Sequence, residues 1–183
     1  MKIKQFYIYL IGIAAVLVTS FVLMFKKGNS IVAPDTWHKG TNDLIKKLHP
    51  KIRSEAAEFI NKVEKDLGSQ LKITSTLRTF EEQSKLYAQG RTDFSKGKVT
   101  NADAGQSNHN YGLAFDCFDV TNQTYHISEK AALIAEKMGF KWGGRWVNLV
   151  DKPHFEKTFG KTWRDLLALH DAGDVDSNGY VNI

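Results

Sequence analysis

Apolar and polar positions alternate along this chain with two different periods, which predicts both helices and strands. Between residues 52 and 67, apolar side chains recur every three or four positions, as on one face of a helix. Residues 71–76 alternate with a period of two, as in a half-buried strand. Further helices are predicted over 41–48, 79–88, 128–138 and 162–170, and a second strand over 111–120. Because the elements follow no regular βαβ order, the fold class is predicted to be α+β.

Local signals set several element boundaries. Thr41 is a plausible N-cap for the first helix, and Gly68 is expected to end the second. Thr79 and Glu82 form a capping box three residues apart. The polar segment 90–110 has no apolar period, and loops of that length in a compact domain are usually functional or mobile.

The N-terminus carries a long apolar run. Residues 6–25 contain no charge, and 20 residues at about 1.5 Å each span a hydrocarbon core of about 30 Å. Lys26 and Lys27 follow the run, where a cleaved secretory signal would have small residues. We therefore favour a retained transmembrane helix over a cleaved signal.

This run divides the chain into three parts. We predict a membrane anchor over 1–27, a tether over 28–40 and one domain over 41–183. Lys2, Lys4 and the amino terminus favour a cytoplasmic N-terminus under the positive-inside rule. The expected protein is a single-pass protein of the cell membrane, with its domain on the periplasmic or extracellular side.

The net charge of +5 belongs mainly to the anchor. Four of the 25 basic residues flank the apolar run, which leaves 21 basic and 20 acidic residues from residue 28 onward. A nucleic-acid-binding domain would carry a basic excess of its own. We therefore expect no nucleic-acid partner.

The first candidate site residues are His109 and Asp116. Asp116 lies in the predicted strand and shares a face with Gly112 and Ala114, whose small side chains would leave room for a metal and a substrate. A carboxylate in an apolar strand is costly unless it is paired or ligated. A hydrogen-bonded aspartate at a strand edge would explain the same pattern.

A second stretch, residues 151–156, places His154 among acidic side chains. Two histidines and one aspartate form a recognised zinc set with an open fourth position. Zinc lowers the pKa of bound water to about 7, and a carboxylate must then take up its proton. Asp151 and Glu156 are both candidates for that base.

The C-terminus contains a separate motif. Residues 174–179 match the first part of an EF-hand calcium loop, D-x-D-x-N-G. The chain ends at Ile183, before the bidentate glutamate. A polar turn leading to a short strand is therefore favoured over a calcium site.

Taken together, these motifs resemble a known family. Ser-x-His-x-x-Gly-x-Ala-x-Asp at 107–116 and Asp-x-x-His at 151–154 are similar to the zinc D-alanyl-D-alanine carboxypeptidases and L-alanyl-D-glutamate endopeptidases. That family includes vancomycin-resistance D,D-peptidases and several phage endolysins. The likeness runs from about 41 to 169, with supporting pieces at 73–79, 82–83, 86–92, 99–102 and 142–146. It implies a small antiparallel sheet with flanking helices, of the hedgehog/D,D-peptidase type.

The resemblance also implies residue roles. Zinc would be held by His109, Asp116 and His154. Asp151 would be the general base, and Arg78 would steady the developing oxyanion or a substrate carboxylate. For Arg78 the alternative is a surface ion pair with Glu81 or Glu82. Substrate binding is expected for Gln83, Ser107 and Trp142. For Trp142 and Trp146, core packing is an equally good interpretation, and Arg145 departs from the residue type of many relatives.

The implied function is zinc-dependent hydrolysis of peptidoglycan stem peptide by a monomer. Asp151, where relatives closer to the carboxypeptidases often have glutamate, and the run at 83–91 favour an L-alanyl-D-glutamate endopeptidase. A D-alanyl-D-alanine carboxypeptidase is the alternative. A third interpretation is a non-catalytic wall-binding module. The presence of all five candidate catalytic residues argues against it.

Overall fold

The computed structural model of the protein describes residues 33–183. The predicted anchor, 1–27, and the first part of the tether lie outside these residues. Within the described range, none of the helices is both long and apolar enough to cross a membrane. The described residues form one compact unit. The indole of Trp37 donates to the carbonyl of Leu71 over 2.9 Å, so the end of the expected tether packs on the domain.

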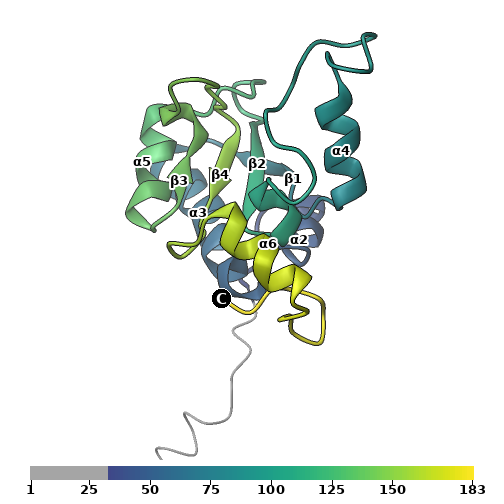
Figure 1. Ribbon diagram of the computed structural model, residues 1–183. Helices are drawn as coiled ribbons and strands as arrows, with labels where there is room; N and C mark the ends of the chain where they lie inside the picture. The colour runs from purple at the N-terminus through teal and green to yellow at the C-terminus, as the bar shows by residue number, and fades with distance from the viewer. Residues whose placement is uncertain (1–32) are drawn as a thin grey trace, which may run out of the picture. The chain divides into compact units, whose positions relative to one another are not determined.

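A four-stranded antiparallel sheet with the order β1-β2-β4-β3 forms the centre of this unit (Figure 1). Its strands are β1 (Leu71–Ser75), β2 (Ala114–Asp119), β3 (Lys141–Trp142) and β4 (His154–Glu156). Successive side chains in a strand point to opposite faces. Phe115, Cys117 and Phe155 are fully buried on one face, and Asp116 and His154 therefore point to the other. The predicted α+β class and small antiparallel sheet are confirmed.

Helices cover the apolar face. The helices are α2 (Lys39–Ile45), α3 (Pro50–Leu67), α4 (Phe80–Ala88), α5 (Glu129–Lys137) and α6 (Trp163–Asp171), with 3-10 helices η1 (Asn108–Tyr111) and η2 (Gly143–Arg145). In Figure 1, α2 and α3 lie behind the sheet. Phe59 of α3 lies 5.0 Å from the ring of Phe155 and 6.1 Å from that of Phe115, centroid to centroid. This aromatic cluster ties α3 to the two strands that carry the site.

Helix ends follow local chemistry, with one exception. Thr79 and Thr162 complete capping boxes at α4 and α6, and Gly68 ends α3 in the left-handed conformation at φ 65°. The expected cap at Thr41 is wrong. His38 caps α2 instead, because the Thr41 hydroxyl is buried and accepts from the backbone N–H of Ile73.

The second predicted strand begins later than expected. Residues 108–111 form the 3-10 helix η1, and Gly112 follows at φ 67°. A Cβ on Gly112 would lie 2.8 Å from the backbone nitrogen of His49, which donates to the Gly112 carbonyl. Gly112 is therefore outside the strand. It allows close approach of the α2–α3 turn, and the idea that it leaves room above a metal is wrong.

The C-terminal aspartate motif is a turn. Asp176 Oδ1 accepts from the backbone N–H groups of Asn178 and Tyr180. An isolated antiparallel bridge joins Val175 to Val181. The carboxylate of Asp176 is thus used to organise the backbone, as the favoured polar-turn prediction has it.

Candidate active site

The sheet register brings two of the predicted ligands together. Asp116 on β2 and His154 on β4 are direct cross-strand partners. Directly opposed residues in an antiparallel pair have Cβ atoms about 4.5–5.5 Å apart and share a face. The Nδ1 atom of His154 lies 3.2 Å from Oδ1 of Asp116 as a result. Neither side chain could reach the other after a one-residue slip.

His109 enters from outside the sheet. It lies in η1, whose first turn is capped by the Ser107 hydroxyl. Its Nδ1 contacts the carbonyl oxygen of Thr76 over 2.7 Å, and its own carbonyl accepts from the N–H of Arg78 over 3.0 Å. The segment that follows β1 therefore holds η1 in place and fixes the imidazole orientation. A neutral His109 that donates from Nδ1 leaves Nε2 free as a ligand.

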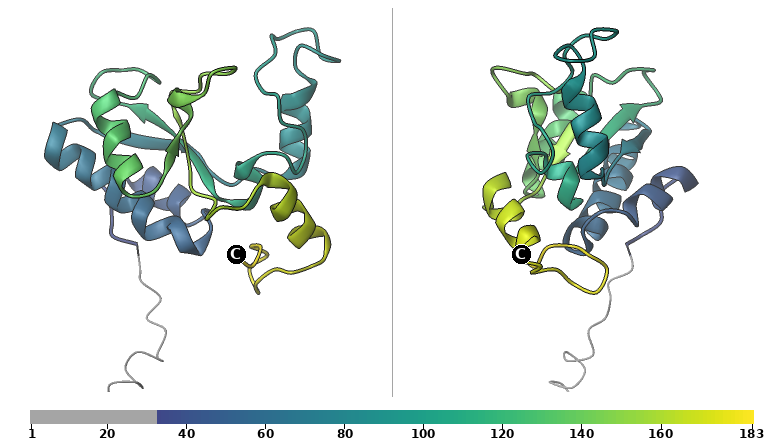
Figure 2. Two further views of the ribbon diagram at one scale, coloured as in Figure 1. Left: turned by 60° about the vertical axis from the view of Figure 1, so that its left-hand side comes forward. Right: turned by 45° about the vertical axis from the view of Figure 1, so that its right-hand side comes forward.

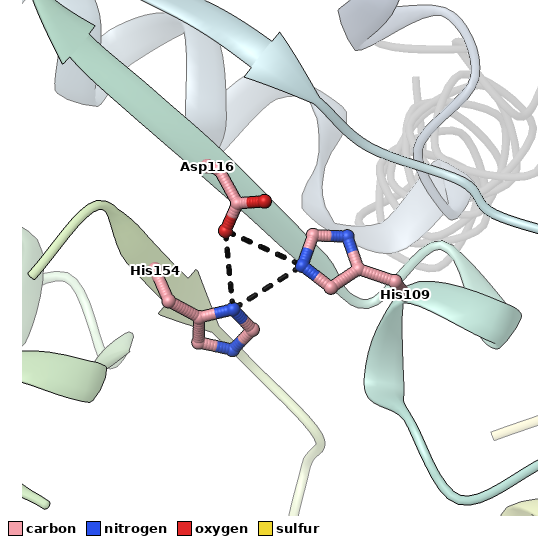
Figure 3. Close-up of side chains that lie close together, drawn as sticks. All are labelled: His109, Asp116 and His154. Carbon is pink, nitrogen blue, oxygen red and sulfur yellow. Dashed lines mark hydrogen bonds and ion pairs between the residues drawn. The ribbon is translucent and has the colours of Figure 1, made fainter. Parts of the chain in front are cut away.

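Three ligand atoms converge at this point (Figure 3). His109 Nε2 lies 3.2 Å from His154 Nδ1 and 3.4 Å from Asp116 Oδ1. Ligands about 2.0–2.1 Å from a tetrahedral zinc lie about 3.3 Å from one another. The donor set and its spacing therefore fit zinc. Within the described residues this is the one group of three or more His, Cys, Asp or Glu side chains placed to hold a metal.

A second layer of contacts orients His154. Its Nε2 lies 3.2 Å from Oε2 of Glu156, and the same oxygen accepts from the Asn108 amide over 2.7 Å. Metal-ligating histidines typically donate their other N–H to a carboxylate, which fixes the tautomer. Glu156, one of the two base candidates, thus contacts Nε2 of His154, the ring nitrogen that does not face the other two ligands. Asp151 remains as the candidate base.

The charges of the cluster are strongly coupled. Burial alone would raise the pKa of Asp116, but hydrogen bonds to His109 and His154 hold it well below its usual range. Burial alone would lower the pKa of His154, but Asp116 and Glu156 raise it to about 9. The two carboxylates thus favour the protonated imidazole, and a cation bound by the same atoms would compete with that proton.

A cavity of about 740 Å³ opens over these ligands. Its walls include Leu86 and residues 99–102 on one side and residues 145–149 on the other. In the left view of Figure 2, the loop that follows η2 lies near the top centre, and α4 stands apart from it at the right. Asp151 and Arg78 line the same cavity as the three ligands. The five predicted catalytic residues are thus brought together in one place.

Asp151 is the first residue of a tight turn that leads to His154. Its N–H donates to the Gly143 carbonyl, and its own carbonyl accepts from the N–H of His154. Burial and the nearby charge of Asp116 raise the pKa of its carboxyl, against the opposing effect of His154. A raised pKa brings a carboxylate closer to the range in which it exchanges protons at neutral pH.

Arg78 is held by neutral partners. Its guanidinium donates to Gln83 Oε1 over 2.8 Å and to the Ser75 hydroxyl over 3.3 Å, and lies 4.0 Å from Asp116 Oδ2. The alternative ion pairs with Glu81 or Glu82 are not formed. Glu81 pairs with Lys85, and Glu82 accepts from Thr79.

Comparison of the sequence with those of known proteins also points to a peptidase. Residues 100–157 match a family model described as D-alanyl-D-alanine carboxypeptidase. Over 124 residues the chain is 36% identical to the peptidoglycan L-alanyl-D-glutamate endopeptidase CwlK of Bacillus subtilis (strain 168), and the match covers 60% of this chain and 72% of CwlK. The chain belongs to the peptidase family that includes CwlK. The crystal structure of the L-Ala D-Glu endopeptidase ChiX of Serratia marcescens matches with a TM-score of 0.47 and 20% identity, over 72% of this chain and 95% of that one.

In this peptidase the three predicted substrate-binding residues lie in different environments. Ser107 lines the cavity. Gln83 is fully buried and joins Arg78 to the carbonyl of Ala102, so it has no surface to offer a substrate and acts through Arg78. Trp142 is 5% exposed and its indole donates to the Lys152 carbonyl. Trp142 therefore packs in the core, as the alternative interpretation of the sequence has it. Trp146 faces the cavity, with its ring centroid 4.9 Å from that of His154.

Two further residues of the peptidase site have no clear signal in the sequence. Asn108 supports Glu156, and the Thr76 carbonyl supports His109. Alternation along β4 from His154 could have placed Glu156 on the same face. Arg145, the departure from relatives, lines the cavity and pairs with Glu129 and Glu136, which lie at α5, away from the metal ligands.

Replacing Glu156 with Gln is expected to weaken zinc binding by roughly tenfold or more, as for other groups that orient a ligating histidine. The glutamine keeps one oxygen that can accept from Asn108 and His154, as Glu156 Oε2 now does, but it removes the negative charge that favours the imidazole N–H. Competition with a chromogenic chelator measures the affinity. Unchanged affinity in Glu156→Gln would contradict the orienting role.

The metal-free peptidase is expected to lose stability as pH rises. The pKa of His154 is raised from 6.5 to about 9 on folding, so its contribution is complete below pH 6.5 and is lost as pH rises through 9. Zinc would replace the proton and remove this dependence. Urea unfolding at pH 6, 7.5 and 9, with chelator and with zinc, measures it. The same dependence in a His154→Gln variant would assign it to another group.

Proposed function

We propose that this protein hydrolyses peptide bonds in peptidoglycan stem peptides with a bound zinc ion, at the L-alanyl-D-glutamate bond. The observation that carries the proposal is the set of three ligand atoms, 3.2 to 3.4 Å apart, in a cavity that Asp151 and Arg78 also line. The 36% identity with an endopeptidase of that bond specificity supports the choice of bond.

Zinc held by His109, Asp116 and His154 would supply a Lewis acid and lower the pKa of a water molecule in the site. The protein's own residues then have two tasks. Asp151 accepts the proton of the attacking water and passes it to the departing amine. Its raised pKa suits both steps, because a strongly acidic carboxyl would hold the proton too weakly to return it.

Arg78 has the task of stabilising negative charge. Its guanidinium is fixed by Gln83 and Ser75, so it needs no reorganisation when the carbonyl oxygen becomes negative. A preorganised cation favours the transition state over the ground state. The full burial of Gln83 strengthens this effect, since its side chain cannot turn away into water.

Digestion of purified sacculi, with and without chelator, tests the proposal. Endopeptidase activity should release fragments with a new N-terminal D-glutamate, detected by mass spectrometry, and chelator should abolish the release. Loss of a single alanine would instead favour the D-alanyl-D-alanine carboxypeptidase, which the description of the matching family model supports. Wall binding without any released peptide, by zinc-loaded protein, would favour the binding module.

We also propose that the domain acts as a monomer outside the cytoplasm, held by the predicted anchor. All five proposed catalytic side chains come from one chain. The uncharged run at 6–25 and its flanking lysines support the membrane location. Fractionation of cells that express the tagged protein, with protease added from outside, tests the location and the orientation.

A further inference from the structure

A second pocket adjoins the active-site cavity at Arg78 and Leu86. It has a volume of about 450 Å³ and lies between the end of α2, the end of β1 and the first turns of α4. Arg78 and Leu86 line both spaces and form their common border. A peptide that has its scissile bond at the metal ligands would therefore have this pocket beside it, across Arg78 and Leu86.

The two spaces differ in charge. Asp116, Asp151 and Glu156 line the cavity that holds the metal ligands. The second pocket contains Lys47, which follows α2, and Lys85, on α4, and both side chains are exposed. Three basic residues thus line the pocket, Lys47, Lys85 and Arg78.

The one acidic residue that lines the second pocket already accepts hydrogen bonds from a neighbouring residue. Glu82 accepts from both the N–H and the hydroxyl of Thr79 at the start of α4. Lys85 pairs with Glu81 over 2.6 Å, but both side chains are mostly exposed, and such pairs exchange readily with other anions. The net charge offered to a ligand is therefore positive.

The other lining groups suit a peptide. Leu44, Leu77 and Leu86 provide apolar surface, and Leu77 is 43% exposed. The Ser75 hydroxyl lies beside the guanidinium of Arg78. This combination of aliphatic surface with cations at the rim fits a short aliphatic chain that carries a carboxylate.

We propose that this second pocket binds a carboxylate-bearing part of the stem peptide beyond the scissile bond, with Lys47 and Lys85 as its cationic contacts. The inference rests on the proposed function for the identity of the peptide. It assigns the two lysines to substrate selection, since neither lines the cavity that contains the metal ligands. The pocket thus favours stem peptides with free carboxylates over their amidated forms.

The test compares two double variants of the full-length, zinc-loaded protein. Lys47→Gln/Lys85→Gln removes both pocket cations. Lys46→Gln/Lys62→Gln is the matched control, because it removes the same charge and two surface lysines that pair with Asp43 and Asp66. The probe is a stem tetrapeptide that contains the L-alanyl-D-glutamyl bond, with free carboxylates beyond that bond or with those carboxylates amidated.

For the free-carboxylate peptide, the pocket variant is expected to raise KM roughly three- to tenfold, with kcat unchanged, as two exposed ion pairs allow. The control variant should behave as wild type. With the amidated peptide, all three proteins should have similar KM values. The difference should also shrink at high salt, because exposed charges are screened.

A binding measurement separates this inference from the proposed function. Fluorescence anisotropy of the labelled peptide is measured on Asp151→Asn protein, with and without the pocket substitutions. A three- to tenfold rise in Kd supports the pocket even if wild type leaves the peptide uncut, in which case the proposed bond specificity fails alone. Cleavage by wild type, with equal KM and Kd in pocket and control variants, would overturn the inference.

Discussion

Replacing Asp151 with Asn is expected to lower kcat on stem peptide by roughly 10²- to 10⁴-fold, the range contributed by a positioned general base. The amide keeps the shape of the carboxyl but cannot accept the proton of the attacking water. Zinc content should remain near that of wild type, because Asp151 is not one of the three converging ligands. Muropeptide release and metal analysis on the same preparation measure the two quantities.

The pH profile sharpens this expectation. Burial raises the pKa of the Asp151 carboxyl, and this carboxyl should give the acid limb of kcat/KM in wild type. That limb should disappear in Asp151→Asn. Asp103→Asn is a suitable control, since Asp103 bonds to Ser84 and does not line the cavity. Full activity of the Asp151 variant would remove it from the mechanism.

The second large effect is expected at the metal ligands. Asp116→Ala should lower zinc affinity by well over a hundredfold, more than the roughly 10- to 100-fold typical of residues that only support a ligand. The substitution removes one of three ligand atoms and leaves His109 Nε2 and His154 Nδ1 facing each other at 3.2 Å. Activity should fall to that of chelated wild type.

Metal content and activity must change together for this interpretation to hold. Dialysed protein is assayed for zinc and for peptide release, before and after excess zinc is added. His170→Gln serves as the control, because His170 packs on Phe80 and lies outside the ligand group. Normal zinc content in Asp116→Ala would show that the metal binds elsewhere.

Short-range features were predictable from the sequence because neighbouring residues decide them. The capping box at Thr79 and the stop at Gly68 act within one helical turn. Apolar spacing alone placed α3 with its buried face. Failures occurred where a distant segment intervened. Thr41 bonds to Ile73 on β1 and leaves the cap to His38.

The identities of the candidate metal ligands also followed from the sequence, through motif spacing and family resemblance. The structure places the ligand atoms of His109, Asp116 and His154 within 4.8 Å of one another. Residue type made this prediction possible, since few side chains bind zinc and their order along the chain is distinctive.

Only the tertiary structure decided how the remaining residues are used. It bonds Glu156 to His154 and Asn108, whereas Asp151 lines the cavity without such a bond to a ligand, a difference that the residue pattern alone left open. It buried Gln83 and Trp142 and exposed the pocket beside Lys47 and Lys85. The physical reason is that side-chain direction and strand register depend on packing between residues far apart in the chain. The β2–β4 register opposes Asp116 to His154 across 38 positions, and no local pattern specifies it.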